Sequence, residues 1–277
     1  VPPILDRLAA APGDGAVLEL PTGWRNGARV LGKSDVLIMM QQWYQTAHGM
    51  PRLGGNTSRN PEYKFQYFSE TPLLGDLIAL MNADQPHIAA ALDGSLDAII
   101  ESDRAIAPAV LDFLGIDRLI VYVDHAPPPL LRFVDEALPV TLIEEWQGSD
   151  WLGRPSTIRL YAVDAAAADA AGHAVDLGGP LGNLYLGEGW AAAPAADGTR
   201  WAIRAAPVLL LDLPAGGSRV TIDWGGPAEG VRATVNGRAV PVGLPGMPGG
   251  PLVVDVPAGI AGAAGDDRAT GGAGHDT

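Results

Sequence analysis

The sequence has no cysteine, only two lysines and no long apolar run. Without cysteine it cannot form a disulfide scaffold or a cysteine-ligated zinc or iron–sulfur site. Its longest apolar stretches, 119–123 and 208–211, have the length of a strand, far short of the ~20 residues of a membrane-spanning helix. Basic residues are few as well: 18 against 32 acidic residues give a net charge of −14, which repels phosphate and argues against a nucleic-acid partner.

Apolar residues and turn-forming residues are abundant. Hydrophobic residues occupy 47% of the 277 positions, which is enough to build a core and excludes a disordered acidic chain. The 36 glycines and 24 prolines favour many turns and argue against a helical bundle. The composition therefore predicts one or two globular domains with many loops.

Residues 1–164 predict an α/β domain. The segment 118–124 (RLIVYVD) is β-branched, aromatic and continuous, as is typical of a buried strand. Residues 36–47 carry apolar side chains at helical spacing, and His48-Gly49 ends that pattern. The alternation of strands and helices predicts a small βαβ-like layer with some parallel pairing. Further strands are expected over 16–20, 141–146 and 157–163, further helices over 4–10, 73–81, 108–114 and 130–138, and a loop over 53–63.

The pattern changes after residue 164. Residues 165–182 are rich in Ala and Gly and are expected to form a linker, and residues 261–277 a flexible Gly/Asp-rich tail. Asn236-Gly237 is a strong hairpin signal. The predicted fold is therefore α+β, with an α/β domain over 1–164 followed by a jelly-roll-like β-sandwich over 183–260. Its short strands are expected over 184–186, 200–205, 208–212, 219–224, 231–235, 239–242 and 252–256.

The common catalytic motifs are absent from the sequence. It contains neither a G-x-S-x-G elbow nor a nucleotide-binding glycine loop, and its five histidines show no metal-ligand spacing. Asp124-His125 ends the strongest predicted strand, where α/β folds place ligands, but a solvated strand end is the simpler explanation. Glu144 and Glu145 are adjacent on a predicted strand and face opposite ways, which does not suit a glycosidase pair. We therefore predict no catalytic residue and no cofactor for this chain.

Two tryptophans are candidates for ligand contact. Trp190 and Trp201 lie near predicted turns of the β-rich half. An indole ring at such a place can stack on the apolar face of a sugar. Core packing is the alternative for each, because tryptophan is highly buried on average.

The tail carries an imperfect repeat. Residues 262–270 (GAAGDDRAT) and 271–277 (GGAGHDT) align at a period of nine, with Asp267 and Asp276 in register. The pattern is similar to the calcium-binding nonapeptide repeat, in which stacked turns supply oxygen ligands. Fewer than two repeats are present, and Ala269 replaces the expected large apolar residue. A flexible tail is therefore favoured over a calcium site at these two aspartates.

A string of motifs runs through the chain between residues 16 and 258. They are VLELP at 17–21, MQQWYQTAHGMP at 40–51, GGNTSRNP at 54–61, FLGIDRLIVYV at 113–123, GEGW at 187–190, RW at 200–201 and VNG at 235–237. Together the motifs resemble the extracytoplasmic C-terminal region of polytopic bacterial membrane proteins of the GT-C type, which in turn resemble glycosyltransferases that use lipid-linked sugars. None of the motifs is a catalytic signature.

The resemblance implies a non-catalytic domain outside the cytoplasm, tethered to a membrane-spanning part of the same protein. In that family the catalytic acidic residue is expected near the first spans, outside this sequence. The implied function is to bind or position a glycan or a lipid-linked sugar acceptor. The residues that match family positions are implied to contact the substrate or to dock onto the membrane part, and they are Tyr44, Gln45, His48, Ser58 and Arg59. Arg59 suits an anion, whereas helix packing for Tyr44 and a helix end at His48 are the structural alternatives.

Two other functions stay open on the sequence. One is a free-standing carbohydrate-active hydrolase that uses carboxylates, which requires a deep pocket with two convergent carboxyl groups. The other is a structural or adhesive module with a calcium-binding tail, whose stability would depend on calcium.

Overall fold

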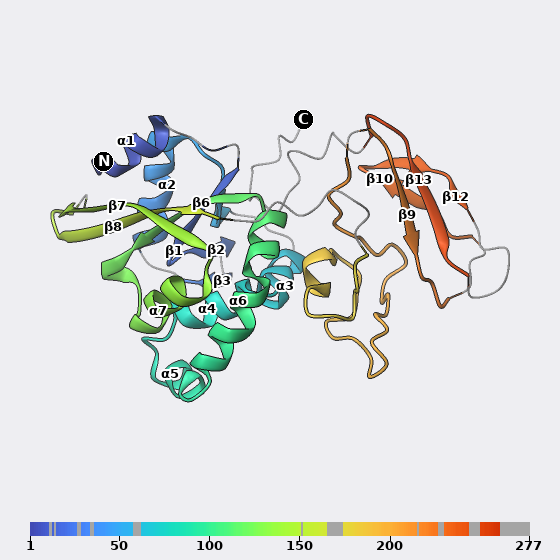
Figure 1. Ribbon diagram of the computed structural model, residues 1–277, viewed down its shortest axis with the longest axis horizontal. Coiled ribbons are helices and arrows are strands. Elements are labelled where there is room, and N and C mark those ends of the chain that lie inside the picture. Colours follow the sequence, from blue (N-terminus) through green and yellow to red (C-terminus); the bar gives the residue numbers. More distant parts are fainter. Residues whose placement is uncertain are drawn as a thin grey trace. The chain divides into compact units, whose positions relative to one another are not determined.

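The chain divides into two compact units in the computed structural model (Figure 1). The first is Val1–Leu210, and the described part of the second is 211–260. This division falls after the predicted boundary at residue 164, because residues 174–210 pack with the first unit and Leu184 is buried in its main core. The structure describes residues 1–10, 13, 15–26, 29–33, 36–57, 62–150, 152–164, 174–214, 216–226, 230–243 and 250–260.

A five-stranded mixed sheet forms the centre of the first unit, in the order β4-β1-β6-β8-β7. Strand β1 (Ala16–Leu20) lies between β4 (Arg52–Leu53) and β6 (Ile116–Tyr122) and is parallel to both. Strand β8 (Pro155–Val163) is antiparallel to β6, and β7 (Val140–Ser149) pairs antiparallel with β8 at the edge. The predicted parallel pairing is thus confirmed for the first strands of the sheet.

Alternating side chains along β1 divide the core into two layers. Val17 packs against helices α1 (Pro3–Ala10) and α2 (Val36–His48) on one face of the sheet. Its neighbours Leu18 and Leu20 belong to the core on the opposite face. The sheet is therefore covered by helices on both sides, which explains why all five residues of β1 are buried and four of them are apolar.

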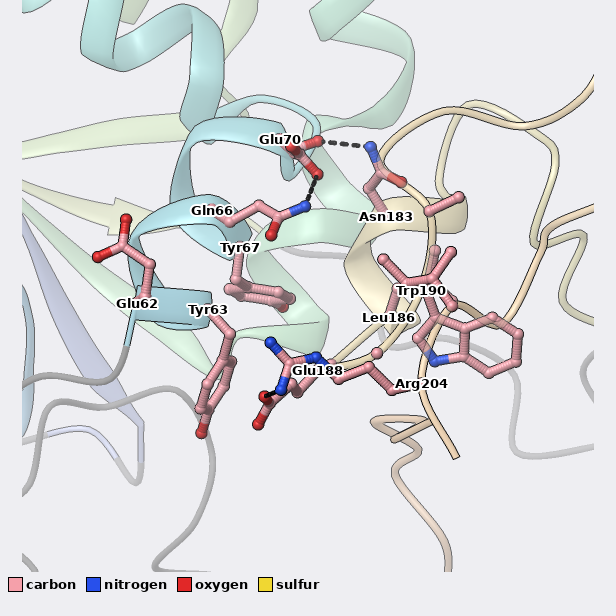
Figure 2. Close-up of a pocket in the computed structure, with 14 residues that line it drawn as sticks. Glu62, Tyr63, Gln66, Tyr67, Glu70, Asn183, Leu186, Glu188, Trp190 and Arg204 are labelled. Atoms are coloured by element: carbon pink, nitrogen blue, oxygen red, sulfur yellow. Dashed lines mark hydrogen bonds and ion pairs between the residues drawn. The ribbon is translucent and has the colours of Figure 1, made fainter. Parts of the chain in front are cut away.

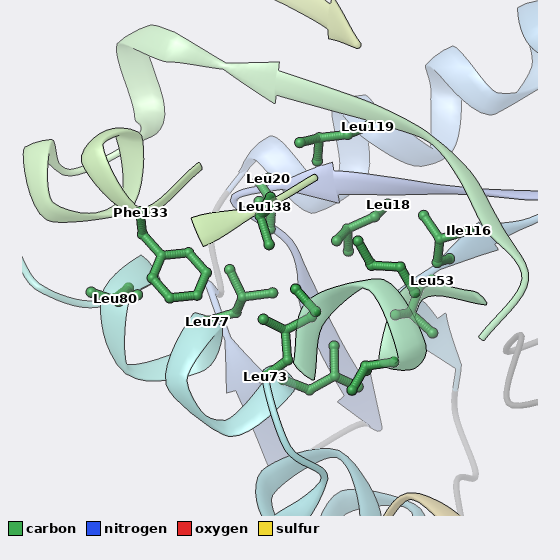
Figure 3. Close-up of a cluster of buried hydrophobic side chains, with 14 of the residues drawn as sticks. Leu18, Leu20, Leu53, Leu73, Leu77, Leu80, Ile116, Leu119, Phe133 and Leu138 are labelled. Atoms are coloured by element: carbon green, nitrogen blue, oxygen red, sulfur yellow. The ribbon is translucent and has the colours of Figure 1, made fainter. Parts of the chain in front are cut away.

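The opposite face carries the larger core. Leu18 and Leu20 lie there with Leu77 and Phe133, which come from helices far apart in the chain (Figure 3). Burial of these aliphatic and aromatic side chains is the main stabilising contribution in the first unit. The helices of this layer are α3 (Glu62–Glu70), α4 (Leu74–Met81), α5 (Pro86–Leu92), α6 (Leu96–Phe113) and α7 (Pro128–Ala137).

A small second sheet continues from the carboxyl ends of β1 and β4. Strand β2 (Gly23–Asn26) pairs antiparallel with β3 (Arg29–Gly32) and parallel with β5 (Gly55–Thr57). Between β4 and β5, Gly54 has a φ of 123°, and a Cβ there would overlap Oγ1 of Thr22, so only glycine fits. The predicted loop over 53–63 is therefore wrong at both ends, since it contains β5 and the start of α3.

The second unit is β-rich. Strands β12 (Val242–Gly243), β13 (Leu252–Val256) and β9 (Ser218–Ile222) form an antiparallel sheet in that order. Strands β10 (Ala233–Val235) and β11 (Arg238–Val240) form a separate hairpin. No closed barrel is present among the described strands, and the jelly-roll-like sandwich stays a prediction.

The hairpin predicted at Asn236-Gly237 is confirmed. Both residues have positive φ, 49° and 74°, as a type I′ turn requires.

Three other predicted strands are wrong. The segment 184–186 begins inside a 3-10 turn, η2 (Gly182–Tyr185), while 200–205 and 208–212 contribute only isolated bridges among the described residues. Glycines at 187 and 189 and a proline at 207 interrupt regular pairing there. The helix predicted over 108–114 is the last part of α6, because Pro108 lies inside that helix and not at its first turn.

Candidate functional site

Three of the motifs contribute residues to a buried polar network formed by Glu19, Gln41, Arg52 and Tyr122. Glu19 is 0% exposed, and Arg52 Nε donates to its carboxylate. Tyr122 Oη donates to the other carboxylate oxygen at 2.7 Å, and Arg52 Nη2 donates to Gln41 Oε1 at 2.8 Å. Gln41 in turn donates to the carbonyl of Pro21 at 2.6 Å. The network thus joins α2, β1, β4 and β6.

Burial controls the titration of this network. It raises the pKa of Glu19, while the charge of Arg52 and the hydrogen bond from Tyr122 act in the opposite direction. Burial also raises the pKa of Tyr122 well above its ordinary range, so the phenol stays protonated and donates. A buried pair of this kind fixes which elements meet, and removing one partner leaves a charge uncompensated.

Three of the residues implied by the resemblance lie beside this network. Tyr44 is 1% exposed and its ring stacks on that of Tyr122. His48 Nδ1 accepts from the N–H of Met50 at 3.2 Å, and Gln45 Nε2 donates to the Met50 carbonyl at 3.2 Å. Burial, and then the charge of a nearby guanidinium, lower the pKa of His48 to about 4, so its ring is neutral at pH 7. In this structure these side chains hold the end of α2 and its turn, as the structural alternatives describe.

Four further candidates lie outside the described residues. These are Ser58 and Arg59 of the motif string and the tail residues Asp267 and Asp276. Within the described ranges, no group of three or more His, Asp or Glu side chains is placed to hold a metal ion. A search of the same ranges finds no helix with the length and apolarity needed to cross a membrane.

An open pocket lies in the first unit between α3 and residues 183–204 (Figure 2). Its volume is about 200 Å³. Aromatic side chains line it from both directions, Tyr63 and Tyr67 from α3 and Trp190 from the opposite segment. The polar side chains that line it are Glu62, Gln66, Glu70, Asn183, Glu188 and Arg204.

Two hydrogen bonds fix the η2 turn against α3. Tyr67 Oη donates to the carbonyl of Leu184 at 3.0 Å, and Asn183 Nδ2 donates to the carbonyl of Glu70 at 3.0 Å. Burial raises the pKa of Tyr67 to about 12, so this phenol remains a donor at neutral pH. The part of the pocket nearest α3 is therefore rigidly held.

The motif GEGW shapes the other wall. Gly189 has a φ of 100°, and a Cβ there would approach Cα of Pro207 to 3.0 Å. Next to it, Trp190 pairs with Ala202 in an antiparallel bridge. Glu188 forms an ion pair with Arg204 at 3.0 Å. Figure 2 shows this pair between the rings of Tyr63 and Trp190.

The two candidate tryptophans occupy different environments. Trp190 is 8% exposed, and its Nε1 donates to the Val208 carbonyl at 2.7 Å, so it is a packed residue that also lines the pocket. Trp201 is 62% exposed and lies one position from the bridge, where its carbonyl accepts from the N–H of Ala191 at 2.9 Å. The indole of Trp201 is therefore open to solvent, and in the sequence it lies near residues that line the pocket.

Sequence reasoning missed α3 and, with it, one wall of the pocket. The signal was present in the spacing of Tyr63 and Tyr67, which are four residues apart and so share one helical face. The loop prediction outweighed it because the preceding residues are polar and rich in glycine.

Comparison with known proteins identifies no relative: no family model, no curated protein and no solved structure matches this chain.

Proposed function

We propose that this chain is a non-catalytic extracytoplasmic domain of a membrane glycosyltransferase-like protein. In this proposal it binds a glycan, or the sugar of a lipid-linked acceptor, in the pocket between α3 and residues 183–204. The observation that carries the proposal is the pocket lining, in which Tyr63 and Trp190 alternate with carboxylate and amide groups. A sugar ring has apolar faces and a polar edge, and such a mixed lining complements both.

The size of the pocket favours a small ligand. Its volume of about 200 Å³ lies below the roughly 300–1,000 Å³ of sites for drug-sized molecules. One sugar ring therefore suits the pocket, with further rings of a glycan outside it. The exposed indole of Trp201 is the surface on which we place a second ring.

The extracytoplasmic placement and the membrane tether are supported by the motif string alone. Its first motifs supply Glu19, Gln41 and Tyr44, which are buried in the first unit and help to hold its fold together. Because these motif residues are structural, the string supports a fold shared with the GT-C-type proteins. Its test is to fractionate source cells with an antibody against this domain. Recovery with membranes, and digestion by protease added to the outside, are expected.

Binding is favoured over hydrolysis by the state of the carboxyl groups. A glycosidase acid is a carboxyl that its surroundings keep protonated near neutral pH. Burial raises the pKa of Glu19, Asp76 and Asp103, and none of the three lines the pocket. Within the pocket, Glu188 is occupied by its ion pair with Arg204.

The sugar-binding part is tested by titrating the full chain with neutral mono- and oligosaccharides, observed by ligand NMR. We expect binding by the wild type and a loss of about tenfold or more in affinity for Tyr63→Ala, because the stacking ring is removed. Tyr63→Phe is the matched control, since it keeps the ring and should retain affinity. If no saccharide binds the wild type, the proposal is wrong.

A further inference from the structure

Two of the three aromatic hydrogen-bond donors that line the pocket, those of Tyr67 and Trp190, are used within the chain. Trp190 Nε1 donates to the Val208 carbonyl at 2.7 Å, and Tyr67 Oη donates to the Leu184 carbonyl at 3.0 Å. Their rings remain as apolar surface, while their polar atoms are satisfied by the backbone.

The amide and guanidinium donors of the pocket are engaged in the same way. Asn183 Nδ2 donates to the Glu70 carbonyl at 3.0 Å, and Gln66 Nε2 donates to the Glu70 carboxylate at 3.2 Å. The guanidinium of Arg204 is paired with Glu188 at 3.0 Å (Figure 2). An amide nitrogen has two N–H groups and a guanidinium has five, so these contacts reduce the donors offered to a ligand without exhausting them.

Acceptors, in contrast, are in excess. The lining contains three carboxylates, those of Glu62, Glu70 and Glu188, against the single guanidinium of Arg204. A carboxylate accepts up to about four hydrogen bonds, so one partner does not exhaust it. The pocket thus offers lone pairs to whatever enters, and its charge depends on which of these carboxylates has a cationic partner.

Glu70 contributes most to this negative character. Glu188 has Arg204 as its partner and Glu62 has Arg29, whereas the carboxylate of Glu70 accepts from the uncharged amide of Gln66. Arg200 lies within electrostatic range of Glu70, but its Nη1 donates to backbone carbonyls of residues 191 and 192. A ligand next to Glu70 therefore faces a carboxylate without a directly hydrogen-bonded cation in the described part of the chain.

We propose that the pocket selects sugars that donate hydrogen bonds and carry no negative charge. Neutral hexoses fit through their hydroxyl groups, and amine-bearing hexoses fit better because the ammonium group both donates and carries positive charge. Uronates and sugar phosphates are rejected by like charge. The inference rests on the proposed function, and it means that the pocket takes the sugar ring of a lipid-linked sugar and not its phosphate.

The test is a matched panel on the full chain, observed by ligand NMR at low ionic strength, where charge effects are least screened. The panel contains glucose, galactose and mannose, each with its hexosamine, hexuronate and 6-phosphate. We expect the hexosamine to bind tightest, the hexose next, and the uronate and phosphate about tenfold or more weaker than the hexose. Glu70→Gln should bring the uronate to within about threefold of the hexose. Glu101→Gln, on the surface of α6, is the charge-matched control and should leave the order unchanged.

The outcomes separate the two proposals. If no member of the panel binds, the proposed function fails and the inference with it. If a hexuronate binds as tightly as its hexose, the charge selection is wrong while sugar binding stands. If the wild type discriminates but Glu70→Gln discriminates equally, the selection does not come from this carboxylate and the inference is overturned.

Discussion

The first unit contains two concentrations of polar side chains, and they differ in what surrounds them. In the buried network, Glu19 and Arg52 have side chains 0% and 3% exposed and pair with one another. In the pocket, Glu188 and Arg204 have side chains 41% and 68% exposed beside open volume. Among the described residues, the first motifs of the string supply the closed network, and α3 supplies much of the open pocket. The motif string therefore contributes to both places, since Glu19 and Gln41 belong to the closed network and GEGW lines the pocket.

Among the variants proposed here, Arg52→Met should destabilise the buried network most. It leaves the carboxylate of Glu19 buried without its cation, for which we expect a loss of about 3–5 kcal/mol in the free energy of unfolding. Urea unfolding followed by circular dichroism measures it. The exposed pair of Arg104 and Glu101 on α6 is the control, and Glu101→Ala should cost less than about 1 kcal/mol.

A double variant distinguishes charge from packing. Glu19→Leu combined with Arg52→Met removes both charges, and much of the stability lost in the single variant should return. If the single variant loses less than about 1 kcal/mol, the ion pair does not hold these elements together.

The next largest effect is a pH dependence centred on Asp103. This residue of α6 is 3% exposed, and burial, followed by the charge and hydrogen bond of Asp76 on α4, raises its pKa to about 7. The pKa in the folded chain thus lies above the ordinary 3.8. Its stabilising contribution is therefore complete below that ordinary value and is lost as the pH rises through about 7.

Asp103→Asn cannot ionise and isolates this contribution. The unfolding free energy of the wild type minus that of the variant should fall by about 1.4 kcal/mol per pH unit between pH 4 and 7. His48 acts in the opposite direction, because its pKa is lowered to about 4 and its contribution is lost as the pH falls from 6.5. The contribution of His48 is present in both the wild type and the variant, so it cancels when their unfolding free energies are subtracted. A difference that does not change with pH would contradict the assignment.

Gly189→Ala tests whether the backbone conformation at Gly189 helps to form the pocket. At a φ of 100°, alanine is strained, and its Cβ would also crowd Pro207, so we expect a cost of about 1–3 kcal/mol. Gly94 has a φ of 76° with nothing within 4 Å of the position a methyl group would take, and Gly94→Ala should cost only the strain, about 1 kcal/mol. Thermal unfolding ranks the two variants, and equal costs would show that the contact with Pro207 has no role.

Sequence reasoning predicted the central sheet better than the pocket, for physical reasons. Strands β1, β6 and β8 are rich in aliphatic, β-branched and aromatic residues, and α2 shows clear helical spacing. The Glu19–Arg52 contact could not be predicted, because the two residues are 33 positions apart and meet only through the parallel pairing of β1 and β4.

The pocket could not be predicted from the sequence, because the residues that form its walls lack a simple helical or strand periodicity of apolar side chains. The aromatic and polar residues of α3 do not form a clean apolar stripe, although Tyr63 and Tyr67 share a face. Residues 186–209 pair through isolated bridges and show no strand-like alternation of apolar and polar residues. The sequence therefore does not indicate that Trp190 is buried while Trp201 is exposed. Which side chain faces solvent there is decided by tertiary packing around Gly189 and Pro207.

The smallest expected stability effect belongs to a pair of exposed tryptophans that differ only in location. Trp201 is 62% exposed beside the GEGW segment, and Trp43 is 63% exposed on α2. Because neither is packed, Trp201→Ala and Trp43→Ala should each change the free energy of unfolding by no more than about 0.5 kcal/mol. Oligosaccharide affinity should fall only for Trp201→Ala, by about threefold to tenfold, and monosaccharide affinity for neither. Equal affinities for both variants would confine ligand contact to the pocket itself, whereas a loss in Trp43→Ala would move the binding surface to α2, next to the closed network.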